Sequence, residues 1–162
     1  MKALKGVYCG SFDPITLGHE AVILSASKMY DLTILIACNS LKKEPLFNEQ
    51  DREKLIKISC PPKIKVQYLA SHRTLGSYCI QHKIDVIVRG LRNINDLEYE
   101  LQIASVNADQ CPAQTVFIPA PPRFGHISSS MVKEVASLGG NISKYVNVHV
   151  KDGLFQKINK IT

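Results

Sequence analysis

The stretch "YCGSFDPITLGHE", residues 8–20, joins an apolar run to a helical pattern and carries more special residues than a plain turn needs. The apolar run "ALKGVYC", residues 3–9, is typical of a buried strand. From His19 onward, apolar residues recur at steps of four, three and four, which places them on one helical face. The stretch therefore predicts a strand that passes directly into a helix.

The same alternation continues along the chain. Apolar runs rich in Val and Ile predict four further strands, at 32–38, 64–69, 85–90 and 115–120. Helical patterns fill the intervals: after a cap at Asn48, over 74–82, after a cap at Asn95, from Ser128 to the Gly139–Gly140 pair, and over 148–161 with a break near Gly153. We therefore predict an α/β fold: a single doubly wound, Rossmann-like domain over residues 1–162, with a five-stranded parallel sheet and helices on both faces.

The composition narrows the function classes. The chain has 162 residues, of which 45% are hydrophobic, and a formal net charge of +6. No segment approaches the roughly 18 uninterrupted apolar residues of a membrane span, and we recognise no signal peptide, so we expect no membrane partner. The positive charge fits a solubilising surface, a nucleic acid or an anionic small molecule. Because no run of five or more basic residues occurs, we expect no nucleic acid partner.

The five cysteines include no C-x-x-C pair. An odd number with this spacing argues against a zinc site and against a disulfide framework. It favours a reducing compartment, and we expect a cytoplasmic protein without a metal site built from its own side chains.

The first strand–helix junction has the features of an anion site. Gly10 ends the strand, Ser11 offers a hydroxyl, and Gly18 allows close approach of the backbone. His19 enters the first turn of a helix, whose unpaired N–H groups and positive dipole end favour an anion. His19 would add a hydrogen bond to that anion, either protonated or as a neutral donor. The alternative is a capped helix with an incidental histidine.

Basic residues follow two other strands. In "SLKKEPLF", residues 40–47, Lys42 and Lys43 are either a solvated pair or include a phosphate ligand. In "VRGLRNINDLEYE", residues 88–100, two arginines flank a glycine, and guanidinium groups suit bidentate recognition of phosphate or carboxylate. Two carboxylates four residues apart further along the same stretch, Asp96 and Glu100, could reach the arginines or a ribose. The alternative is a surface cluster of ion pairs.

A run of three serines, Ser128 to Ser130, enters the next helix and supplies hydroxyl and N–H groups at another N-terminus. A single serine would suffice as a cap. The sequence contains no G-x-S-x-G, P-loop or G-x-G-x-x-G motif, and no cysteine paired by motif with a histidine. Cations, hydroxyls and backbone donors suit transfer of a phosphorus group between substrates that bring their own nucleophile.

These residues together resemble the nucleotidyltransferases with an (H/T)-x-G-H motif, here "TLGH" at 16–19. The match is closer to one family within them. "GSFDPITLGH", "RGLRNINDLEYE" and "ISSSMVKEVA" resemble, in order, the corresponding blocks of the bacterial phosphopantetheine adenylyltransferases, over about residues 5–160. The resemblance implies transfer of an adenylyl group from ATP to 4'-phosphopantetheine in coenzyme A biosynthesis, giving dephospho-coenzyme A and pyrophosphate, with Mg²⁺ accompanying ATP. It also implies a homo-oligomer, commonly a hexamer in this family, and a possible feedback binding of coenzyme A.

The resemblance also assigns roles to individual residues. The implied catalytic residues are His19, Lys43, Arg92 and Ser130. The implied ATP-binding residues are Ser11, Phe12, His19, Gly90, Leu91, Arg92, Glu100, Phe124, Gly125, His126, Ile127, Ser128, Ser129 and Ser130. The implied phosphopantetheine-binding residues are Ser11, Lys43, Leu75 and Arg89, with Lys42 as the alternative to its neighbour Lys43.

The chain departs from the family pattern at several of these positions. Cys9 stands where the family commonly has Pro, Glu44 stands where it often has a cation, and Phe124 and His126 replace a Trp and another apolar or aromatic residue. Two other functions stay open. One is a relative with a different acceptor, such as nicotinamide mononucleotide or, with CTP, a glycerol phosphate. The other is a non-catalytic protein that binds nucleotide or RNA on the same sheet.

Overall fold

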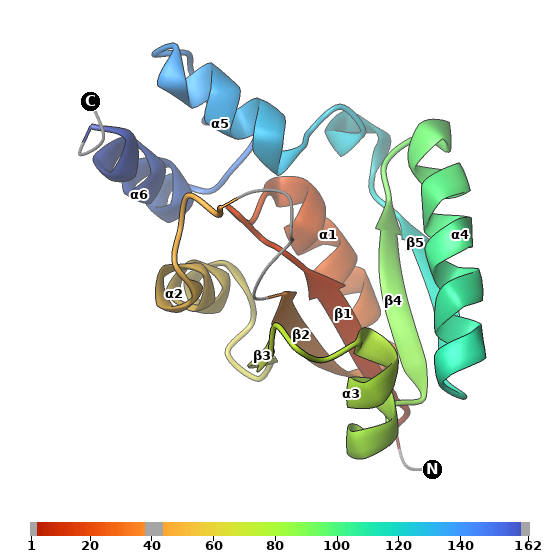
Figure 1. Cartoon of the computed structure of the whole chain (residues 1–162). Coiled ribbons are helices and arrows are strands. Elements are labelled where there is room, and N and C mark those ends of the chain that lie inside the picture. The colour runs from red at the N-terminus through yellow and green to blue at the C-terminus, as the bar shows by residue number, and fades with distance from the viewer. Residues whose placement is uncertain (1–2, 38–43, 160–162) are drawn as a thin grey trace.

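The computed structural model describes residues 3–37 and 44–159 of the chain (Figure 1). Five strands form one parallel sheet in the order β3-β2-β1-β4-β5. Their bounds are β1 Lys5–Gly10, β2 Asp31–Ala37, β3 Lys65–Leu69, β4 Val86–Leu91 and β5 Gln114–Pro119. The predicted doubly wound α/β fold is confirmed, and each predicted strand is present.

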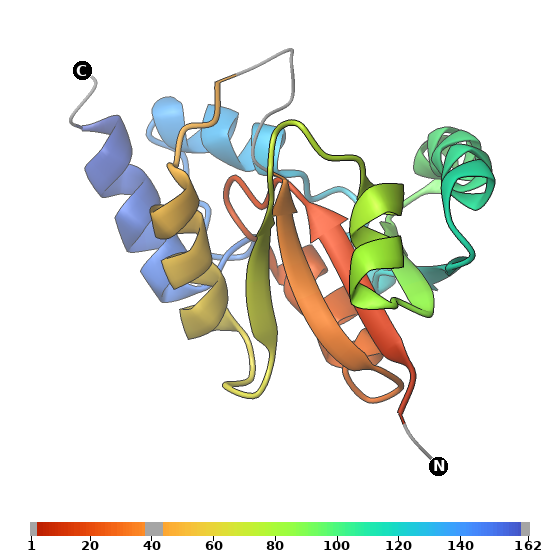
Figure 2. The same cartoon turned by 60° about the horizontal axis from the view of Figure 1, so that its bottom comes forward.

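Helices cover both faces of the sheet (Figures 1 and 2). The six α-helices are α1 Leu17–Ala26, α2 Glu49–Ser59, α3 Leu75–His82, α4 Ile94–Gln110, α5 Ser129–Ser137 and α6 Val148–Ile158, and a short 3₁₀ turn spans Pro122–Phe124. Buried side chains of α1, α2, α5 and α6 share one core with the sheet, whereas α3 and the end of α4 border a second core on the opposite face. A strand of this sheet is therefore apolar on both sides, as its sequence indicated.

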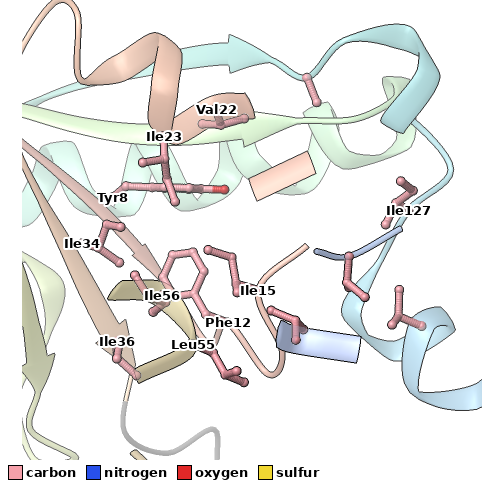
Figure 3. Packing of buried hydrophobic residues seen from close by; sticks show 14 of the residues in the cluster. Tyr8, Phe12, Ile15, Val22, Ile23, Ile34, Ile36, Leu55, Ile56 and Ile127 are labelled. Atoms are coloured by element: carbon pink, nitrogen blue, oxygen red, sulfur yellow. The ribbon is translucent and has the colours of Figure 1, made fainter. Parts of the chain in front are cut away.

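Alternate residues of the strands point into the two cores. Tyr8 and Ile34 face α1, where they pack with Phe12 and Ile23 (Figure 3). Their strand neighbours, such as Val7, face α3. β1 lies between β2 and β4 at the centre of the sheet; it pairs with β2 as far as Gly10 but with β4 only as far as Tyr8.

Two helix boundaries differ from the prediction. The cap of α4 is Asn93, not Asn95, because the Asn93 side chain accepts a hydrogen bond from the Asp96 N–H at 3.0 Å. The last helix is continuous through Gly153, and the break expected there is wrong. A Cβ at Gly153 would lie 3.6 Å from Leu55 Cδ2 of α2, so packing between the two helices outweighs the low helix propensity of glycine.

Candidate active site

A cleft of about 490 Å³ opens at the carboxyl ends of β1 and β4. These are the central strands at which the winding of the sheet changes direction, the place where doubly wound folds bind ligands. Eleven of the predicted site residues line the cleft: Ser11, Phe12, His19, Arg89, Gly90, Arg92, Glu100, Ile127, Ser128, Ser129 and Ser130. Segments that are more than one hundred residues apart in sequence thus meet at one edge of the sheet.

Other predicted site residues do not line this cleft. Leu91 is the last residue of β4. Residues 124–126 precede the serine run in sequence, and Phe124 Cβ lies 3.7 Å from the position that a Cβ of Gly18, a residue of the cleft, would take. Leu75 begins α3 and packs against the second core, to which Cys9 also belongs. Lys42 and Lys43 lie outside the described residues.

Several lining residues were not predicted as site residues. They are Tyr8, Cys9, Thr16, Val22, Tyr99 and Ala120. Tyr8 and Val22 are buried in the core, at 7% and 2% exposure, and no motif of the sequence marks them as site residues. The sequence points to these two side chains only indirectly, through the glycine between the two arginines. A Cβ at Gly90 would lie 3.0 Å from Tyr8 Oη and 3.1 Å from Val22 Cγ2, so close packing of both side chains favours a residue without a Cβ there.

The first junction fixes both the position and the protonation state of His19. Thr16 is the cap of α1, and its backbone N–H donates to His19 Nδ1 at 3.1 Å. Because Nδ1 accepts this bond, the ring proton is on Nε2, and Nε2 has no partner among the described residues. Burial, together with the charge of Arg92, lowers the pKa of His19 to about 4. Of the two predicted alternatives, the neutral donor fits the structure and the protonated ring does not.

Arg89 is held by a carboxylate before any ligand binds. Its Nε and Nη2 donate to Glu100 Oε2 and Oε1 at 2.5 and 2.7 Å, and its Nη1 donates to the Cys9 carbonyl oxygen at 3.1 Å. Only 19% of the Arg89 side chain and 14% of the Glu100 side chain are exposed. This bidentate pair fixes the plane of the guanidinium at the end of β4.

Arg92 forms a second, more exposed pair. Its Nε and Nη2 each lie 2.9 Å from an oxygen of Asp96, and its Nη1 donates to the Ile127 carbonyl oxygen at 3.1 Å. The side chains of Arg92 and Asp96 are 37% and 21% exposed. The predicted ion-pair cluster therefore exists, and the same arginines line the cleft, so the two interpretations of this stretch are not exclusive.

The three serines have separate roles in the structure. Ser128 Oγ accepts from the Met131 N–H at 3.1 Å and caps α5. Ser129 Oγ donates to the Pro14 carbonyl oxygen at 2.7 Å, which ties α5 to the first junction. The Ser130 hydroxyl has no partner among the described residues and lines the cleft.

A buried carboxylate strengthens the contact between α5 and the first junction. Asp13, 4% exposed, forms an ion pair with Lys133 of α5 at 2.6 Å. Its two oxygens also accept the backbone N–H groups of Leu46 and Phe47, at 3.0 and 2.8 Å. No pattern in the sequence predicts this group, because its partners lie 33 to 120 residues away.

No helix in the described part of the chain is long and apolar enough to cross a membrane. Within the same residues, His, Cys, Asp and Glu side chains form no group of three or more that could hold a metal ion. The two carboxylates nearest the arginines, Asp96 and Glu100, are already engaged by them.

Comparison with known proteins shows the family of the chain. Residues 7–135 match the model of the cytidylyltransferase-like family. A phosphopantetheine adenylyltransferase from Thermotoga neapolitana is 38% identical over 155 residues, which cover 95% of this chain and 96% of that protein. The chain therefore belongs to the cytidylyltransferase-like nucleotidyltransferases and, within them, to the phosphopantetheine adenylyltransferase family.

Solved structures share the fold. Nicotinic acid mononucleotide adenylyltransferase from Plasmodium falciparum superimposes with a TM-score of 0.65 at 18% identity, over 99% of this chain and 96% of that one. A lipopolysaccharide core biosynthesis protein from Thermoplasma volcanium gives a TM-score of 0.55 at 26% identity, over 73% of this chain and 98% of that one.

Proposed function

We propose that this chain transfers the adenylyl group of ATP to 4'-phosphopantetheine, giving dephospho-coenzyme A and pyrophosphate. The relative that is 38% identical is a phosphopantetheine adenylyltransferase, and the match covers 96% of its length. The observation that carries the proposal is the neutral His19, whose free Nε2–H lies at the cleft with Arg92 and the N-terminus of α5. Such a site stabilises charge on phosphoryl oxygens and holds no group that must become a nucleophile.

In the proposed reaction, a phosphate oxygen of the acceptor attacks the α-phosphorus of ATP. The bond between the α-phosphorus and the oxygen that bridges it to the β-phosphate breaks. The nucleophile is already an anion, so no general base is required. The leaving electron pair goes to pyrophosphate. His19 donates its Nε2–H to an oxygen of the α-phosphate as charge develops, which a neutral imidazole can do without losing its proton.

The two faces of the sheet suggest which substrate binds where. The serines of α5 and His19 lie at the α1 side of the cleft and fit the triphosphate. Arg89 and Leu75 lie on the α3 side, next to the second core, and fit the acceptor with its apolar pantetheine arm. Lys43 remains the predicted ligand of the acceptor phosphate, with Lys42 as its alternative.

Mg²⁺ enters this proposal as part of the MgATP substrate. The site offers cations and hydroxyls rather than a set of free carboxylates, so the triphosphate oxygens and water would supply most ligands of the ion. Bound in this way, Mg²⁺ would neutralise charge on the departing pyrophosphate.

The proposal is tested by measuring pyrophosphate release with MgATP and 4'-phosphopantetheine. We expect turnover well above the rate without acceptor. Nicotinamide mononucleotide, and glycerol phosphate with CTP, serve as competing acceptor systems in the same assay. Faster turnover with either of them would reassign the substrate, and salt-sensitive RNA binding without any turnover would favour the non-catalytic alternative.

Three further expectations belong to this proposal. A hexamer would be seen as a mass near six times 18.0 kDa by light scattering. Feedback binding of coenzyme A would raise the KM for ATP or for the acceptor. A cytoplasmic location is expected because the number of cysteines is odd and none of them form a C-x-x-C pair, which favours a reducing compartment.

A further inference from the structure

We propose that Arg52 of α2 is a positioning residue for the anionic substrate, because its buried guanidinium orients the Ser11–Phe12 peptide so that the Phe12 N–H is presented to the cleft. This inference rests on the proposed function only in taking a nucleoside triphosphate as the ligand. It adds a role for a side chain that does not line the cleft itself.

Arg52 lies directly behind the first junction. It is 2% exposed, and its Nη1 donates to two carbonyl oxygens, Ser11 at 2.9 Å and Ala37 at 3.0 Å. These carbonyls stand just beyond β1 and at the end of β2, at the edge of the sheet where the cleft opens. Arg52 thus bridges the two strand ends from the α2 side.

The orientation of one carbonyl determines the orientation of the next N–H. In a trans peptide the C=O and N–H groups point in opposite directions, and the Ser11–Phe12 bond is trans. Since the Ser11 carbonyl points to Arg52, the Phe12 N–H points away from α2. Both Ser11 and Phe12 line the cleft, and this N–H has no partner among the described residues.

The local backbone conformation needs support. Phe12 has a φ of 47°, in the left-handed region that a non-glycine residue rarely adopts. Such a conformation persists where the surroundings enforce it, and it is frequent at ligand sites. Arg52 holds the peptide on one side of Phe12, while the Phe12 ring packs in the core near Ile15 and Ile56 (Figure 3).

Arg52 carries a buried charge that has no counter-ion among the described residues. No carboxylate among the described residues forms an ion pair with it, and its buried Nε has no hydrogen-bond partner. The segments outside the described residues contain no Asp or Glu. A neutral donor would suffice to hold two carbonyl oxygens, and a buried charge without a counter-ion costs free energy. An anion that binds on the other side of the peptide would offset that cost.

The test compares Arg52→Met with Lys54→Met, which removes the same charge from an exposed position of the same helix. Affinity for MgATP and for inorganic pyrophosphate is measured by calorimetry, alongside the thermal midpoint without ligand. We expect R52M to bind both at least about tenfold more weakly, whereas K54M binds within about twofold of the wild type. Because Arg52→Met leaves the carbonyl oxygens of Ser11 and Ala37 without their donor, the thermal midpoint without ligand is expected to fall, so affinities are compared at a temperature at which each variant is folded.

Arg52→Lys provides the rescue. A single nitrogen makes both contacts in the wild type, so a lysine ammonium can replace it, and R52K should bind MgATP within about threefold of the wild type. Arg52→Gln takes the place of R52M, with the same threshold, if R52M does not fold. Wild-type affinity in R52M or R52Q, or an equal loss in K54M, would overturn the inference.

The two proposals fail in different ways. If the wild type binds MgATP but does not turn over 4'-phosphopantetheine, the acceptor assignment fails and Arg52 is still tested by binding. If the wild type turns over and R52M binds normally, only the role of Arg52 fails. A wild type that binds neither MgATP nor pyrophosphate would overturn both.

Discussion

The cleft has two halves that are prepared for ligands in different ways. In the half formed by β1, α1 and α5, hydrogen-bond donors are fixed but lack partners: His19 Nε2, the Phe12 N–H and the Ser130 hydroxyl have none among the described residues. In the half formed by β4 and α4, each arginine is already paired with a carboxylate.

The unpaired donors of the first half are suited to stabilise charge that develops during a reaction, whereas the paired arginines of the second half are suited to hold a fixed structure. An unpaired, fixed donor gains a hydrogen bond when an anion arrives and needs no reorganisation. A paired arginine must share or exchange its carboxylate to bind the same anion, so part of its interaction energy is already used. We therefore expect substitutions in the first half to affect turnover most, and substitutions in the second half to affect stability most.

The largest expected effect is that of His19→Ala on turnover. Loss of one fixed donor to the reacting phosphate should lower kcat about 100- to 1,000-fold, with the KM for ATP changed less than about threefold. Steady-state pyrophosphate release measures both parameters. His149→Ala, an exposed histidine on α6, should leave them unchanged. Near-normal turnover in H19A would remove the distinction between the two halves.

The protonation state of His19 should make folding stability depend on pH. An unfolded histidine takes up a proton near pH 6.5, and the folded ring does so only near pH 4, so between these values the unfolded state binds more protons. Stability should therefore fall as the pH falls from 6.5 to 4. The His19 contribution to this loss is about 2 kcal/mol, reduced from the full linkage value because the ring edge reaches the cleft.

Urea unfolding of the wild type and H19A across this pH range isolates the effect, since carboxylate titrations are common to both. The difference between the two unfolding free energies should change through the window and become constant below about pH 4. A difference that stays constant from pH 7 to 4 would mean that His19 titrates normally in the folded protein.

The second half is tested by breaking its two ion pairs separately. Glu100→Gln leaves the mostly buried Arg89 without a counter-charge and should destabilise the protein by about 2 kcal/mol. Asp96→Asn breaks the more exposed pair and should cost less than about 1 kcal/mol. Urea unfolding at pH 7 measures both, and equal losses would contradict the ranking by burial.

An effect smaller than that of Glu100→Gln is expected at the contact between the halves. In Gly90→Ala, the new Cβ would meet Tyr8 Oη and Val22 Cγ2 at 3.0 and 3.1 Å, so stability should fall by about 1 kcal/mol and the KM for ATP should rise a few-fold. Tyr8→Phe removes the closer of these two atoms. The cost of G90A should therefore be smaller in the Y8F background, and an unchanged cost would show that Val22 alone sets it.

Much of the fold follows from short-range patterns in the sequence. The strands appear as Val- and Ile-rich runs. The predicted cap at Asn48 is confirmed, and the helix predicted to follow Ser128 begins directly after it, because a cap depends on residues only three positions apart. The Asn93–Asn95 stretch shows the limit of this reasoning: either asparagine could cap α4 by local rules, and the bond to Asp96 N–H selects the first.

The sequence by itself determined that strand–helix junctions rich in glycine, serine, histidine and arginine would meet at one edge of a parallel sheet, because the chemistry of a junction is local and the fold places all carboxyl ends together. Only the tertiary structure decided that His19 is neutral, that Asp13 pairs with Lys133, and that Arg52 turns inward to the Ser11 carbonyl. These properties depend on burial and on partners that lie 41 to 120 residues away, and local patterns in the sequence do not predict such contacts.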